Sequence, residues 1–198
     1  LSYTGAAVNL GAKTLTLSGG GTLSNTNALV LNYTTSKLLL NSITVDSVST
    51  SANSLGLDVD NNSTITALSV GHITPVSIAA SKSLSGGITV TAGSLKLNET
   101  GTLVSTVTMS GGTLDADKNL TVSGALTHTA DITIDVANNK TLTYSGSAIS
   151  VGANTITLSG GGSLVSGGLT LNNADSKLLL NSITLDSAST SANSLGID

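Results

Sequence analysis

The segment Lys13-Thr-Leu-Thr-Leu-Ser-Gly-Gly-Gly21 alternates leucine with hydroxyl residues and then ends in three glycines. Residues at every second position of an extended strand project to the same side, so the leucines share one face and the hydroxyl residues the other. The glycines supply the positive φ angles that a tight turn needs. The same pattern returns in Asn154-Thr-Ile-Thr-Leu-Ser-Gly-Gly-Gly162. We therefore predict short strands joined by tight corners, without helices.

The end of the chain repeats its beginning. Of the 23 positions in Ser36–Asp58, only three differ in Ser176–Asp198, and every change is aliphatic: Val45 becomes Leu185, Val48 becomes Ala188 and Leu57 becomes Ile197. The two copies are offset by one position more at the triple glycine (Gly21 and Gly162) than at the following lysine (Lys37 and Lys177), so one residue is lost between them. Near-exact long repeats are typical of stacked, quasi-one-dimensional folds. We predict one continuous solenoid, with residues 1–141 as the first repeat unit and 142–198 as a partial second copy.

The composition favours a narrow aliphatic core. The 198 residues include no Phe, Trp or Cys and only three Tyr, and 9% are charged, against about 25% in ordinary domains. Seven basic residues in a chain of net charge −4 form no patch for a phosphate backbone, so we expect no nucleic-acid partner. No apolar run approaches the roughly 18 residues of a membrane helix, so we expect no transmembrane segment in this region.

An antiparallel sandwich or barrel and a parallel β-solenoid both fit short strands with tight corners. The long repeat, the location of the single-residue deletion in a corner segment and the lack of aromatic residues favour the solenoid. Three strands per coil would need roughly 20–24 residues, which predicts about nine coils in the chain and six or seven in the repeat unit. The inward positions predict this core: Leu15, Leu17, Leu29, Leu31, Leu38, Leu40, Ile43, Val45, Leu55, Leu57, Ile65, Leu68, Val70, Ile88, Val90, Leu95, Leu97, Leu120, Val122, Ile132, Ile134, Val136, Ile156, Leu158, Leu178 and Leu180.

Two short sequence segments resemble those of a known class of proteins. Leu15-Thr-Leu-Ser-Gly-Gly-Gly-Thr-Leu23 and Val107-Thr-Met-Ser-Gly-Gly-Thr-Leu-Asp115 resemble the passenger repeats of bacterial autotransporters and filamentous-haemagglutinin-type surface adhesins. The resemblance covers most of the chain and rests on motifs of low complexity. It implies a right-handed parallel β-helix outside the cell that serves adhesion or display.

Two acidic segments are candidate cation sites. Asp58, Asp60 and Asn62 stand at i, i+2 and i+4, and Asp115, Asp117 and Asn119 repeat this spacing. On a strand these oxygen ligands project from one face, where calcium could bridge them. Neither segment completes a calcium-binding loop, and the alternative interpretation is solvated aspartates at a corner that keep neighbouring solenoids apart.

Other chemistry is weakly represented. His72 and His128 are the only histidines and lie in different segments, no serine stands in a Gly-x-Ser-x-Gly context, and we expect neither a catalytic residue nor an organic cofactor. A glycan-cleaving β-helix enzyme is the less favoured alternative, because it needs clustered charges in a groove. Ice binding would use Thr-x-Thr pairs on a flat face, but the pairs starting at Thr14, Thr64, Thr89, Thr106, Thr141 and Thr155 are unevenly spaced.

These observations lead to an expected function. We expect a structural segment of a large, repetitive, extracellular β-solenoid protein that acts as a stalk, filament or surface adhesin. A carbohydrate-, calcium- or ice-binding solenoid is the alternative. Strand edges at the ends of a solenoid are unpaired, so we expect either that the rest of a longer protein covers them or that copies of the chain associate end to end.

Overall fold

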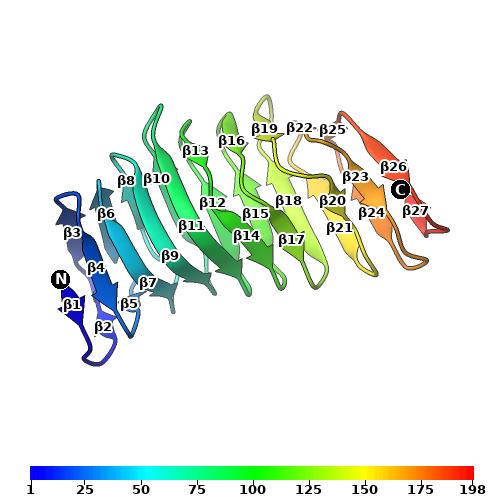
Figure 1. Cartoon of the computed structure of the whole chain (residues 1–198). Helices are drawn as coiled ribbons and strands as arrows, with labels where there is room; N and C mark the ends of the chain where they lie inside the picture. Colours follow the sequence, from blue (N-terminus) through cyan, green and yellow to red (C-terminus); the bar gives the residue numbers. More distant parts are fainter.

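In the computed structural model, which describes all residues 1–198, the chain winds as a parallel β-solenoid without any helix (Figure 1). Every strand pair is parallel, and strands adjacent in a sheet come from successive coils. The sequence separation of in-register neighbours ranges from 19, as between Lys96 and Asp115, to 24, as between Asp135 and Ser159. The solenoid prediction is therefore confirmed, and an antiparallel sandwich or barrel is excluded.

Each coil contributes strands to three ladders that run along the rod. The first ladder is a ten-stranded sheet, so the chain makes about ten coils, one more than the sequence predicts. Its strands are β3 (Thr14–Ser18), β6 (Lys37–Asn41), β8 (Gly56–Val59), β10 (Thr74–Ile78), β12 (Ser94–Leu97), β15 (Thr113–Ala116), β18 (Ile132–Val136), β21 (Thr155–Ser159), β24 (Lys177–Leu180) and β27 (Gly196–Ile197).

The second ladder forms the main path of a fourteen-stranded sheet. Its strands are β1 (Ser2–Tyr3), β4 (Thr22–Asn25), β7 (Thr44–Thr50), β9 (Ser63–Val70), β11 (Ser83–Val90), β13 (Thr102–Leu103), β16 (Leu120–Val122), β19 (Thr141–Tyr144), β22 (Ser163–Val165) and β25 (Thr184–Leu185). The long strands β7, β9 and β11 continue past this ladder into the third one, and the pairing of β9 with β11 shifts register between Gly86 and Gly87.

The third ladder is divided into two parts. Its first part consists of β2 (Val8–Asn9), β5 (Leu29–Leu31), the C-terminal halves of β7, β9 and β11, then β14 (Thr106–Met109) and β17 (Leu126–His128). Its second part is a separate three-stranded sheet of β20 (Ile149–Ser150), β23 (Leu169–Leu171) and β26 (Ala188–Thr190).

The core is a single cluster of 41 buried hydrophobic residues inside the coils. Strand alternation places like residues in columns: Leu95, Leu114, Ile134 and Leu158 are in-register neighbours in successive coils, and all are at most 1% exposed. Branched aliphatic side chains stacked at the spacing of about 4.8 Å between strands fill a narrow interior without large rings. This explains how a chain with so few aromatic residues forms a continuous core.

Two core predictions are wrong. Leu55 is 52% exposed because it lies in the corner before β8, where strict alternation does not hold and Gly56 has a φ of +81°. Leu180 is 39% exposed because the next coil pairs only with Lys177 and Leu178, which leaves the end of β24 uncovered. Leu15, Leu17 and Ile43 are only partly buried and pack against the core from its edge.

The two sequence copies form the same local contacts. The Ser36 hydroxyl donates to the Gly11 carbonyl, and the Ser176 hydroxyl donates to the Gly152 carbonyl. Asn32 Oδ1 accepts from the Gly11 amide at 2.8 Å, and Asn172 Oδ1 accepts from the Gly152 amide at 2.9 Å. The equivalent strands β3 and β21 are seven steps apart in the first ladder, so the repeat unit corresponds to seven coils.

Candidate functional site

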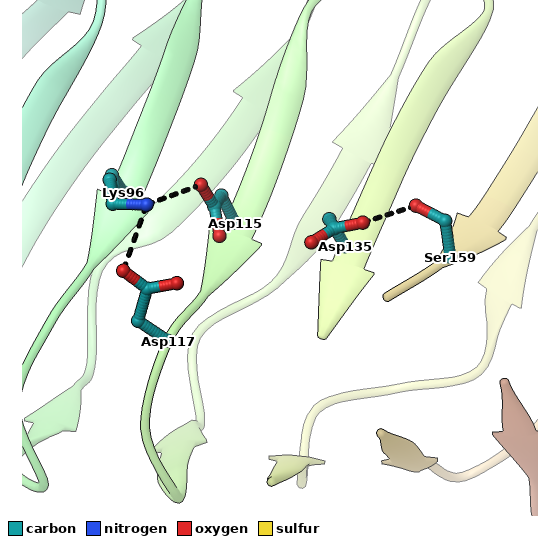
Figure 2. A network of polar contacts seen from close by, with 5 residues as sticks. All are labelled: Lys96, Asp115, Asp117, Asp135 and Ser159. Atoms are coloured by element: carbon teal, nitrogen blue, oxygen red, sulfur yellow. Dashed lines mark hydrogen bonds and ion pairs between the residues drawn. The ribbon is translucent and has the colours of Figure 1, made fainter. Parts of the chain in front are cut away.

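The outer face of the first ladder carries a polar network around Lys96 (Figure 2). Lys96 on β12 lies in register with Asp115 on β15, which in turn lies in register with Asp135 on β18. Lys96 Nζ is 2.8 Å from Asp117 Oδ2 and 3.1 Å from Asp115 Oδ2, and the Ser159 hydroxyl donates to Asp135. Winding therefore brings residues from four successive coils into one line of polar groups.

The pKa values of both Lys96 and Asp115 are raised, but for different reasons. The hydrogen bond with Asp117 is the main cause that raises the pKa of Lys96 above 10.5, with Asp115 adding to it. Burial raises the pKa of the Asp115 carboxyl above 3.8, and the neighbouring carboxylates add to the rise while Lys96 opposes it. Two carboxylates thus stabilise the charged form of Lys96. Burial destabilises the charged form of Asp115, which shares a single ammonium group with Asp117.

The structure places the predicted ligands Asp115 and Asp117 around this ammonium (Figure 2). The third member, Asn119, lies beyond the network, and its Oδ1 accepts a hydrogen bond of 2.8 Å from the Thr141 amide. Spacing along one segment could not reveal Lys96, because it precedes Asp115 by one coil. The sequence signal that finds it is a lysine one coil length before an aspartate, a separation of 19 in this region.

The other predicted set lies on and after β8. Asp58 forms an ion pair with Lys37 of the preceding coil, and the Asn62 Oδ1 accepts from the Ser83 amide at 3.0 Å. Asp60 is exposed and lines a groove of about 360 Å³ together with Asp58 and Glu99. Glu99, two coils further on, is an acidic neighbour that sequence reasoning missed.

The six predicted ligands thus lie in two separate groups on the rod. Nowhere in the chain do three or more His, Cys, Asp or Glu side chains come together in a way that could hold a metal ion. Lysine ammonium groups lie where a cation would bridge Asp115 with Asp117 and where it would contact Asp58. Calcium binding at these residues stays a prediction.

The largest groove has a volume of about 480 Å³ and crosses the outer face of the first ladder. Its lining is mostly small and polar, with one carboxylate, Asp131, whose Oδ1 accepts from the Thr155 amide at 2.7 Å. The residues that line it are Gly112, Thr113, Asp131, Ile132, Thr133, Thr155, Thr157 and Leu179. Hydroxyl groups and one carboxylate in an open groove offer hydrogen bonds to a ligand but no nucleophile–base pair.

The remaining candidate groups are dispersed. His72 is exposed in a corner, and His128 is partly buried at the end of β17, where both ring nitrogens lie 3.0 Å from backbone carbonyl oxygens. The six Thr-x-Thr pairs divide among all three ladders, so no single face carries them. One regular hydroxyl row does exist in the third ladder, formed by Ser49, Ser69, Thr89, Thr108 and Thr127.

Comparisons with known proteins add no relative. No protein-family model, no curated protein sequence and no solved structure matches the chain. None of its secondary structure is a helix long and apolar enough to span a bilayer. The fold places the chain among the parallel β-solenoids, with a repeat of seven coils.

Proposed function

We propose that this chain is a structural segment of a large, repetitive, extracellular β-solenoid protein that serves as a stalk, filament or surface adhesin. The single observation that carries the proposal is the agreement between the sequence copies and the fold. Ser36 and Ser176 bond the preceding coil in the same way, and the ion pair Lys37–Asp58 has its counterpart in Lys177–Asp198. Repetition that preserves such contacts extends a rod without altering its cross-section.

The surface supports a mechanical role. Hydroxyl side chains and short corners cover the rod, and the four ion pairs all connect one coil to the next. Exposed ion pairs contribute little stability each, about 0–1 kcal/mol. Their use is to fix the register of neighbouring coils and to keep flat strand faces soluble.

The same geometry supports end-to-end association of copies. At the C-terminal end, β27 is the outermost strand of the first ladder and Ile197 is 48% exposed; at the other end, β3 is outermost with Leu15 and Leu17 only partly buried. An unpaired edge and an aliphatic column on each end complement each other in a second copy. Such a head-to-tail contact does not close and therefore builds a fibre.

Electron microscopy of the purified 198-residue chain tests this proposal. We expect rods that lengthen with protein concentration. Ile197→Glu should shorten them because it places a charge in the head-to-tail contact between copies. Leu55→Glu is the matched control, since Leu55 is 52% exposed on the side of the rod. Short particles of uniform length at high concentration, or equal effects of both variants, would contradict end-to-end assembly.

A further inference from the structure

The third ladder is interrupted at one place while the other two continue. Strands β17 and β20 are neighbours in space (Figure 1), yet β17 pairs only with β14 and β20 only with β23. Across the same coils the first ladder continues through β15, β18 and β21, and the second through β16, β19 and β22. The rod is therefore held by backbone pairing on two sides and lacks it on the third.

Two side chains replace the missing strand pairing. Tyr144, which is 4% exposed, accepts a hydrogen bond of 3.0 Å at its Oη from the backbone amide of Leu126. His128 lies at the end of β17, and its Nε2 is 3.0 Å from the carbonyl oxygen of Ser150 on β20. The first contact satisfies a buried backbone amide and the second an exposed carbonyl, both of which a strand would otherwise pair. They are single contacts between side chain and backbone, so separating the two strands breaks fewer bonds here than between regularly paired coils.

The local sequence shows that this arrangement is built in. A Cβ atom added at Gly146 would collide with the ring and hydroxyl of Tyr144, so the ring can fold against the corner only beside a glycine. The N-terminal copy has the same pair, and a Cβ atom at Gly5 would collide with Tyr3. The Tyr-x-Gly corner thus recurs with the same offset as the triple glycines Gly21 and Gly162, which corresponds to seven coils.

We propose that the break between β17 and β20 is a joint, at which the rod bends and opens on the side of the third ladder before any other coil separates. The first and second ladders stay paired when the joint opens, and the contacts of Tyr144 and His128 hold the joint closed. One such corner in every repeat unit places a joint every seven coils, or about 34 Å at the usual strand spacing. The joint is a property of the fold and stands whether or not the rod serves as a stalk.

Native-state hydrogen exchange of the full chain, resolved by NMR, tests the joint. Leu126 and Val107 are in-register neighbours and both are buried, but the Val107 amide donates to a backbone carbonyl, that of Ala125, whereas the Leu126 amide donates to Tyr144. Local opening exposes the weaker side first. We expect the Leu126 amide to exchange about tenfold faster than that of Val107, the ratio that one weak hydrogen bond produces.

Tyr144→Phe removes the acceptor and should raise the exchange of Leu126 by about a further tenfold, leaving Val107 unchanged. Tyr33→Phe is the matched control, because Tyr33 is 56% exposed and its hydroxyl has no partner. Equal exchange of Leu126 and Val107 in the unsubstituted protein would overturn the joint. A uniform acceleration in all coils of Tyr144→Phe would also overturn it, and the unsubstituted profile decides the matter if that variant does not fold.

Discussion

Truncation of Leu114 to alanine tests the inside-outside assignment of the solenoid most directly. Leu114 lies in the middle of the rod, is 1% exposed, and stacks between Leu95 and Ile134 of the adjacent coils. The substitution removes three carbon atoms from the core, which costs about 2.4 kcal/mol in transfer free energy at about 0.8 kcal/mol per methylene group. The strand of Leu114 is paired on both sides with strands of the adjacent coils. The site therefore collapses little and a cavity remains. We therefore expect a total loss of about 3–5 kcal/mol in the free energy of unfolding.

Urea unfolding followed by far-ultraviolet circular dichroism measures this loss. Leu55→Ala is the matched control, because Leu55 is 52% exposed and surface truncations usually change stability by about 0.5 kcal/mol or less. In a stacked array a weak central coil also divides the rod, so the Leu114→Ala transition should broaden or split. Equal losses for Leu114→Ala and Leu55→Ala would refute the reasoning, since both leucines would then have similar surroundings.

Three further predictions concern particular contacts. Gly86→Ala should destabilise the fold by about 1 kcal/mol or more relative to the control Gly19→Ala in the same urea assay. Both glycines have positive φ, 115° and 113°. Only at Gly86 would the new Cβ overlap a backbone atom, the Ile65 carbonyl oxygen. Because the folded-state pKa of Asp115 is raised, its carboxylate opposes folding at neutral pH and this penalty disappears as the pH falls through the raised pKa. Asp115→Asn should thus be more stable relative to the unsubstituted chain at neutral pH than at mildly acidic pH in urea titrations, and an unchanged difference would contradict the burial argument. Finally, if calcium binds at the sequence-predicted ligands Asp58 and Asp60, a chelator should lower the melting temperature in calorimetry and Asp60→Asn should abolish that response. No response in the unsubstituted chain would remove calcium from the function.

The sequence alone determined the repeating, all-β, parallel character of the chain. Period-two alternation and glycine corners act over a few residues, so they can be recognised without knowing which strands meet. They predicted most of the buried positions, including the stacked Leu95 and Ile134. Alternation failed to predict the exposure of Leu55 and Leu180. The burial of these side chains depends on a corner, for Leu55, and on the next coil, for Leu180.

Only the tertiary structure decided which residues meet across coils. The separation of in-register neighbours varies between 19 and 24 along the rod, so a fixed period cannot place Lys96 beside Asp115 and Asp117, or Glu99 in the groove of Asp58. Strand alternation by itself does not reveal the break in the third ladder, because Tyr144 has an ordinary strand pattern around it. Only the structure shows that the strand pairing stops beside the repeated Tyr-x-Gly corner. Local steric preferences act within a strand and are written in its residues, whereas register between coils results from the packing of the whole rod.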